Sequence, residues 1–181
     1  MSKNVGKKHE QINLQIVILK ERYIIMKKIF LTVLSLFLVS LSVFAGDKDD
    51  ALKAFNTYVK TANNYDNAVT TFYTPNAKII RQVIKPDGGL VDVVTDTSTY
   101  ITQMKLSQAV ARARKYKNNY TNVVVTPISA GKVKISSVRH PSVDNDSLKA
   151  YMIFQKQPNG KWLIVEELMQ TRQQIFLKYA K

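Results

Sequence analysis

The chain has 181 residues, no cysteine and a formal net charge of +14 at pH 7. The lack of cysteine excludes disulfides, thiolate metal sites and lipid attachment through a cysteine. The positive charge favours attraction to anionic surfaces, although a solvated lysine-rich surface has the same composition.

A secretory signal is predicted over residues 26–45. Met26 is followed by two lysines, a predominantly apolar stretch over residues 29–41, and small side chains ahead of Gly46. This is the order of basic region, apolar region and cleavage site in exported proteins. We therefore expect a mature protein that begins near Gly46 and is periplasmic or secreted. In the alternative, the segment is retained as an inner-membrane anchor, for which its length is at the lower limit.

Residues 1–25 form an extension that an ordinary signal peptide lacks. The Lys-Glu-Arg tripeptide at residues 20–22 can be encoded by a purine-rich string of the ribosome-binding type, suitably spaced before the codon of Met26. We interpret residues 1–25 as a wrongly assigned upstream extension, and the alternative keeps Met1 as the true start. What remains after residue 45 has the length of one domain.

Two helices are predicted at the start of this domain. Acidic residues at positions 47–50 precede apolar residues at helical spacing, which indicates a helix from Ala51 to the Asn63-Asn64 turn. Asp66 is placed to cap a second, short helix that runs through Tyr73 and is terminated by the following Thr-Pro pair.

A hairpin and a third helix follow. Strands are predicted over residues 77–84 and 90–94, around a Pro-Asp-Gly-Gly turn. Asp96 or Ser98 then caps a helix that runs to about Tyr116. We expect its apolar positions to be Tyr100, Ile101, Met104, Leu106, Ala109, Val110 and Ala113. Basic side chains in its last turn suit the negative end of the helix dipole, so they require no ligand.

The remainder is predicted to be β-structure. Strands are expected over residues 122–129, 132–139, 147–157 and 161–169, with a tail helix over residues 170–181.

Three short motifs carry a resemblance to a known family. They are Asp66 at the start of the second helix, the Phe-Tyr-Thr-Pro-Asn-Ala sequence of residues 72–77, and the Asn-Gly-Lys-Trp-Leu-Ile-Val-Glu sequence of residues 159–166. With the element order ααββαββββ, they resemble the nuclear transport factor 2-like (NTF2-like, SnoaL-like) superfamily. The resemblance implies an α+β cone over residues 46–171, in which a curved mixed sheet wraps around the helices, followed by a tail over residues 172–181.

Such a cone implies a pocket between helices and sheet. On the last strand, simple alternation places Glu166 on the face of Trp162 and places Glu167 on the other face, so one glutamate points inward. We expect Glu166 to be either a pocket acid or a carboxylate at the rim. The candidate lining residues are Tyr58, Tyr100, Arg139, Trp162 and Glu166.

Catalytic groups are sparse. Steroid-isomerase-like members use a carboxylate base and a tyrosine that stabilises the enolate, and Tyr58 with Glu166 is a weak match to this pair. His140 at a strand end is more typical of a surface turn than of a base. Neither a metal site nor a cofactor is expected, because the histidines and carboxylates show no ligand spacing.

The function expected from the sequence is an exported, non-catalytic NTF2-like binding or accessory module for a small apolar ligand or a protein or peptide partner. The alternatives are a small lyase or isomerase of the SnoaL or ketosteroid-isomerase type, and a membrane-anchored VirB8-like assembly subunit of a secretion system. An anionic component of the cell envelope and a second copy of the chain are further partners to consider, whereas nucleic acid is not expected.

Overall fold

The computed structural model describes residues 22–23, 25–30 and 46–180. Residues 22–23 and 25–30 are helical. Most of the predicted signal, its cleavage site and the upstream extension lie outside the described residues. Within the part of the chain that is described, no helix is both long and apolar enough to cross a membrane.

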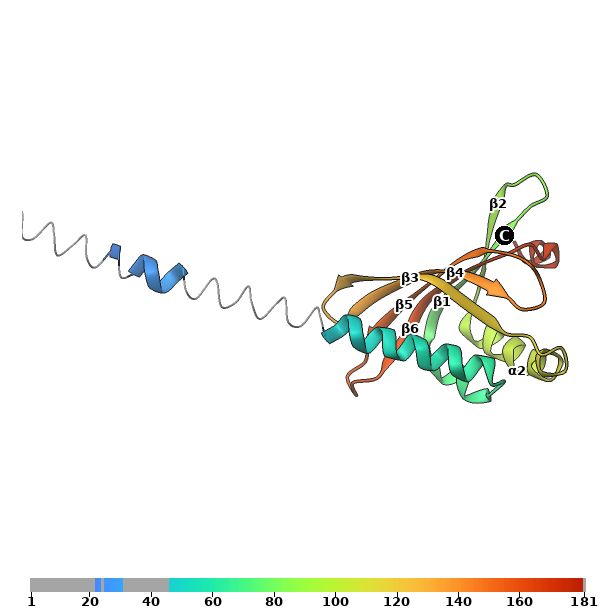
Figure 1. The fold of residues 1–181 in the computed structure, drawn as a ribbon, viewed down its shortest axis with the longest axis horizontal. Helices are drawn as coiled ribbons and strands as arrows, with labels where there is room; N and C mark the ends of the chain where they lie inside the picture. The colour runs from blue at the N-terminus through green and yellow to red at the C-terminus, as the bar shows by residue number, and fades with distance from the viewer. Residues whose placement is uncertain (1–21, 24, 31–45, 181) are drawn as a thin grey trace, which may run out of the picture. The chain divides into compact units, whose positions relative to one another are not determined.

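The domain that follows is built on a six-stranded mixed sheet (Figure 1). Its order is β2-β1-β6-β5-β4-β3, and β1 and β6 run parallel while the other neighbours run antiparallel. The predicted α+β class and element order are confirmed. The strands are β1 (Tyr73–Ile84), β2 (Leu90–Thr95), β3 (Asn118–Ser129), β4 (Lys132–Pro141), β5 (Leu148–Lys156) and β6 (Trp162–Thr171).

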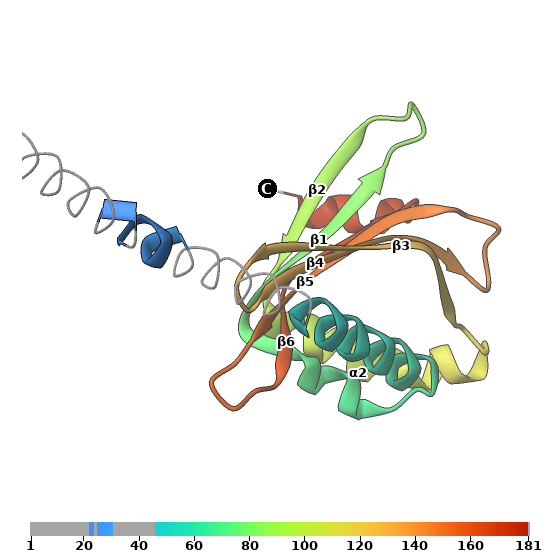
Figure 2. The ribbon, with the colours of Figure 1, turned by 60° about the vertical axis from the view of Figure 1, so that its left-hand side comes forward.

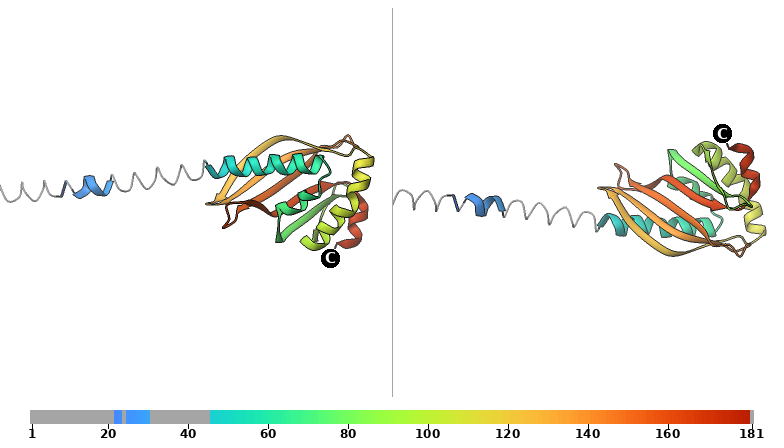
Figure 3. Two further views of the ribbon diagram at one scale, coloured as in Figure 1. Left: turned by 90° about the horizontal axis from the view of Figure 1, so that it is seen from below. Right: turned by 90° about the horizontal axis from the view of Figure 1, so that it is seen from above.

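Helices cover one face of this sheet. A long helix over residues 46–63 and α2 (Thr97–Ala113) lie on the same side of the strands, as Figures 2 and 3 show. Between the long helix and β1 lies η1 (Asn67–Phe72), a 3₁₀ helix, and η2 (Gln174–Tyr179) packs beside β1 and β2. The space between helices and sheet holds the core and the cavity described below.

The two predicted caps are confirmed. The Asp66 carboxylate accepts from the Ala68 amide at 2.8 Å, and the Asp96 carboxylate accepts from the Thr99 amide at 2.9 Å. Hydrogen bonds from the side chain of Ser98 and the amide of Thr99 hold the pKa of Asp96 well below its usual range. The capped elements therefore begin where the sequence indicated.

The predicted end of α2 is wrong, and four of the seven apolar positions expected on it are exposed, namely Leu106, Ala109, Val110 and Ala113. The helix ends at Ala113 rather than near Tyr116, because Lys115 adopts a left-handed φ of 52°. Leu106 and Val110 are 76% and 58% exposed. The inward face of α2 is set by Thr97, Tyr100, Met104, Gln108 and Ala111, and Leu106 and Val110 lie on the opposite side.

Several strands are longer than predicted. β1 begins at Tyr73 and β3 at Asn118, because each strand tolerates a register shift near its start, between Tyr73 and Lys78 and between Thr121 and Val124. The tail helix predicted from residue 170 is also wrong at its start. Residues 170 and 171 pair with β1 as the end of β6, and the helical turn after them is the 3₁₀ helix η2.

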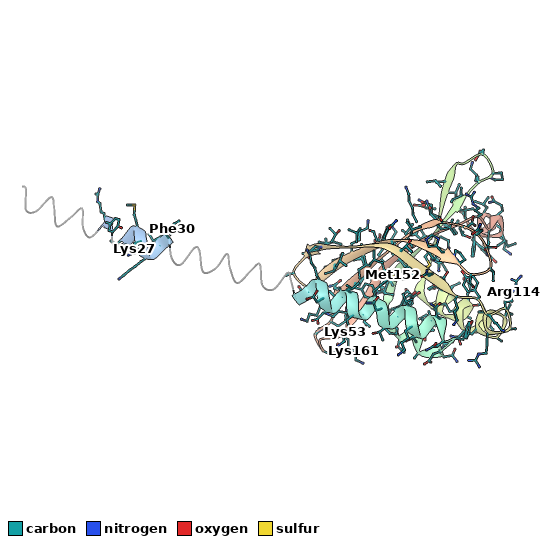
Figure 4. All side chains as sticks on the ribbon, in the orientation of Figure 1. Lys27, Phe30, Lys53, Arg114, Met152 and Lys161 are labelled. Carbon is teal, nitrogen blue, oxygen red and sulfur yellow. The ribbon has the colours of Figure 1, made fainter. Side chains whose placement is uncertain are left out.

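The long helix is fixed at both ends to the sheet. Near its start, the buried Asp47 carboxylate accepts from the Gly131 amide at 2.7 Å. At its other end, the Asn63 side chain donates to the Asn118 carbonyl and accepts from the Asn118 amide, both at 2.9 Å. The apolar side chains between these two anchors pack on the inner face of β4, β5 and β6, where Met152 lies (Figure 4). These anchors set the depth of the space between the helix and the sheet.

Candidate functional site

A β-bulge in β6 decides which glutamate faces the helices. Ile153 of β5 pairs with Glu166 and Phe154 pairs with Ile164, so Val165 is an extra residue without a partner of its own. The side-chain alternation is reset at this point. Glu167 therefore shares the inner face with Trp162 and Ile164, and it is completely buried.

Both carboxylate oxygens of Glu167 are occupied. Oε1 accepts from Arg81 at 2.7 Å and from the Tyr100 hydroxyl at 3.2 Å, and Oε2 accepts from the Tyr73 hydroxyl at 2.6 Å. The Tyr58 and Tyr73 hydroxyl oxygens lie 3.0 Å apart. Because Tyr73 gives its single proton to Glu167, Tyr58 donates to Tyr73. Burial of a charge is tolerated here because it is paired and fully hydrogen-bonded.

The phenols of this network stay protonated. Burial, followed by the negative charge of Glu167, raises the pKa values of Tyr58 and Tyr73 well above their ordinary value. Burial also raises the pKa of Tyr100 to about 12, although the nearby Arg81 acts in the opposite direction. The Arg81 guanidinium lies over the Tyr100 ring at 4.7 Å, which fixes both side chains. The phenol protons are therefore retained over the neutral pH range and engaged inside the network, so the Tyr58 and Tyr100 hydroxyl oxygens present acceptor lone pairs to the cavity.

These two hydroxyls line a cavity of about 690 Å³ between α2, the ends of the long helix and η1, and the sheet. Tyr58, Arg81 and Tyr100 form one part of its wall, while Glu167 lies behind them. Apolar side chains supply another part, namely Ala62, Val69, Met104, Ala111, Leu148, Met169 and Phe176. A volume of this size and a wall that mixes apolar and polar groups are typical of small-molecule sites.

A second polar group lies on the same wall, at Arg139 of β4. Its Nη1 donates to the Tyr116 hydroxyl at 3.1 Å and to Asn118 Oδ1 at 2.9 Å, and its Nη2 donates to the Gln170 carbonyl at 2.7 Å. Its Nε is buried without a hydrogen-bond partner, as is the hydroxyl oxygen of Tyr65, which lines the same cavity.

The candidates named from the sequence divide into two groups. Tyr58, Tyr100 and Arg139 line the cavity, and Trp162 and Glu166 do not. Glu166 lies on the outer face of the sheet, where it accepts from the Tyr151 hydroxyl at 2.6 Å. Simple alternation placed it with Trp162, and that prediction is wrong because the bulge at Val165 intervenes. Tyr58 and Glu166 are thus on opposite faces and form no pair.

His140 lies on the outer side of β4, apart from Glu167. Its ring nitrogens lie 2.9 Å from the Thr121 hydroxyl and 3.2 Å from the Ser147 hydroxyl. Over residues 22–23, 25–30 and 46–180, no group of three or more histidine, aspartate or glutamate side chains is placed to hold a metal ion. The polar side chains that line the cavity are tyrosines, arginines, amides and hydroxyls, together with Asp144 and Asp146.

Sequence reasoning missed four residues of this site: Glu167, Tyr73, Arg81 and Tyr65. The adjacent glutamates were a usable signal, because a buried strand with two successive carboxylates must turn one of them inward. Which one it turns depends on the bulge, and nothing local to Val165 indicates a bulge. Tyr73 and Arg81 were not distinguishable from ordinary strand residues.

Comparison with solved structures identifies the fold. The chain is similar to an NTF2-like protein of unknown function from Shewanella oneidensis, with 12% identity over 68% of this chain and 98% of that one, and a TM-score of 0.51. A protein of unknown function from Pectobacterium atrosepticum is 18% identical over 70% of this chain and 91% of that one, with a TM-score of 0.51. An uncharacterised protein with a cystatin-like fold from Caulobacter vibrioides is 9% identical over 67% of this chain and 87% of that one, with a TM-score of 0.50. No protein-family model and no curated protein matches the chain. These likenesses support the expected NTF2-like architecture and carry no activity with them.

Proposed function

We propose, starting from the NTF2-like fold of this domain, that the protein is a binding module that holds a small organic molecule in the cavity between helices and sheet. The observation that carries the proposal is the state of Glu167, whose two oxygens are already bound by Arg81, Tyr73 and Tyr100. The groups that line the cavity are hydroxyls, amides, arginines and apolar side chains, together with Asp144, which is exposed, and Asp146, which is paired with Arg172. They can orient a ligand but include no unengaged buried base.

The position of the carboxylate also favours binding over catalysis. A general base must reach the proton that it removes, directly or through one water. Glu167 is completely buried and lies behind the residues that line the cavity. A ligand in the cavity would meet Tyr58 or Tyr100 first, and both hydroxyls keep their protons in bonds to Tyr73 and Glu167 and can accept a hydrogen bond from the ligand.

One observation favours a lyase or isomerase as the second candidate. The Tyr58 hydroxyl lines the cavity and is connected through Tyr73 to Glu167. If the Tyr58 proton turned from Tyr73 to a ligand oxygen, Tyr58 would supply a hydrogen bond to a developing oxyanion, as isomerases of this chemistry require. The pairing of Tyr58 with Glu166 is not part of this candidate, because the two residues lie on opposite faces.

A cavity-filling variant tests the binding proposal. We expect compounds from a thermal-shift library of neutral aromatic and aliphatic molecules to stabilise the wild-type domain and to lose this effect in Ala111→Phe, which fills the cavity from α2. The matched control is Ala109→Phe, at an exposed position of the same helix. Persistent binding by Ala111→Phe, or no binding by the wild type, contradicts the proposal. Mass spectrometry of the bound compounds separates the candidates, since a binding module returns them unchanged and an enzyme converts them.

Export forms part of the proposal, on the basis of the basic and apolar segments that precede Gly46. We expect protein expressed from its own start and recovered from the periplasmic fraction to have an amino terminus near Gly46. Amino-terminal sequencing measures this directly. An intact terminus in a membrane fraction would instead favour the anchored secretion-system alternative.

A further inference from the structure

The cavity contains one buried cation that no carboxylate neutralises. Arg139 is 6% exposed, and its hydrogen bonds go to a phenol, an amide oxygen and a backbone carbonyl. It forms no ion pair with any carboxylate in the described part of the chain. Its Nε also has no partner.

Among the described residues, none of the other charged side chains on the cavity wall forms an ion pair with Arg139. Arg81 is paired with Glu167 at 2.7 Å, so these two groups cancel. Asp146 is paired with Arg172 at 3.1 Å, and Asp144 is exposed. Of the residues that the structure describes, Arg139 is therefore the buried charge on this wall that has no carboxylate in direct contact with it.

An uncompensated buried charge is costly, and a missing partner at a buried donor adds to the cost. An incoming anion would reduce both costs, because it supplies the opposite charge and an acceptor. A planar carboxylate suits a guanidinium best, since it can accept two parallel hydrogen bonds. The Tyr65 hydroxyl, which is also unpartnered on this wall, is a further donor for such a group.

We propose that the ligand of this cavity is a small organic acid, whose carboxylate binds at Arg139 while its apolar body lies against Met104 and the neighbouring apolar wall. This inference rests on the proposed function and specifies its ligand class. It assigns Arg139 as the residue that sets the preference for an anion. Tyr58 and Tyr100 are left to contact the remainder of the ligand.

A pair of nearly isosteric probes tests the inference on the wild-type protein. We expect 1-naphthaleneacetate to bind at least about 10-fold more tightly than 1-naphthaleneacetamide in NMR or calorimetric titrations, because a hydrogen bond to a charged group is the stronger one. Equal affinities, or tighter binding of the amide, overturn the inference, while binding of the amide leaves the proposed function standing. If neither probe binds, both proposals are contradicted for this class of compound.

Two variants test whether Arg139 causes the preference for the acid over the amide. Arg139→Gln is expected to abolish the acid-over-amide preference and to leave the amide affinity within about 3-fold. Arg114→Gln removes the same charge from the exposed end of α2 (Figure 4) and is expected to keep the preference.

Because Arg139 also holds Tyr116 and Asn118, circular dichroism must first establish that its variant is folded. If it is not, Arg139→Lys serves instead, with a reduced preference expected. A preference unchanged in the Arg139 variant, or lost in Arg114→Gln, overturns the assignment.

Discussion

Replacement of Glu167 with glutamine is expected to lower the free energy of unfolding by about 3–5 kcal/mol, the usual effect of removing one partner from a buried ion pair. The change leaves the Arg81 guanidinium buried without a counter-charge and removes an acceptor of the Tyr73 and Tyr100 hydroxyls. Urea unfolding followed by circular dichroism measures the loss.

The adjacent residue provides the control. Glu166→Gln makes the same chemical change one position earlier, on the outer face, where its hydrogen bond to Tyr151 is only partly buried. A loss of about 1 kcal/mol or less is expected there. Equal losses in the two variants would contradict the account of the bulge. Replacing Arg81 and Glu167 together by methionine should recover only part of the stability, because no unpaired charge then remains but the Tyr73 and Tyr100 hydroxyls lose their acceptor.

Alkaline pH is expected to unfold the domain between about pH 10 and 12, through its buried tyrosines. The pKa values of Tyr58, Tyr73 and Tyr120 are raised well above 10, mainly by burial, and that of Tyr100 is raised to about 12. Below pH 10 these phenols are protonated in both states and their contribution is fully present. Above pH 10 only the unfolded state loses protons, so stability falls by about 1.4 kcal/mol per pH unit for each such tyrosine.

The substitution Tyr100→Phe measures how much one tyrosine contributes to this pH dependence of stability. In Tyr100→Phe, the slope of unfolding free energy against pH should be smaller by one tyrosine's share between pH 10 and the pKa of Tyr100 near 12. The control is Tyr179→Phe, which removes a phenol that is 55% exposed. Tyrosinate absorbance and chemical unfolding, measured at each pH, give the two quantities. An unchanged slope in Tyr100→Phe would show that this hydroxyl ionises equally in both states.

The fold was predictable because its local signals agree with its long-range pairing. Asp66 and Asp96 cap their helices, and Gly88, Gly131 and Gly160 occupy the hairpin turns with the positive φ that favours glycine. The ends of elements were less predictable. Asn118 starts β3 because it pairs with Pro141 and bonds Asn63, contacts that only the assembled domain provides.

The site was predictable only in part, because the face on which a strand residue lies also depends on pairing with other strands. Tyr58 and Tyr100 lie on helix faces that periodicity identifies, and both line the cavity as expected. Arg139, which was named only as a candidate lining residue, lies on the inner side of β4 in plain alternation and lines the cavity. Glu167 could not be assigned in this way, because a bulge depends on pairing with β5 rather than on residues near Val165.

The extra residue in β6 has a consequence for comparing this chain with its relatives. Two successive residues, Val165 and Glu166, separate the inward Ile164 from the inward Glu167. A homologous gene that lacks one codon here would reach the same interior by plain alternation, with its acid two positions after the isoleucine. Aligning such genes column by column would then match the enclosed acid of one protein to the outward-facing acid of the other.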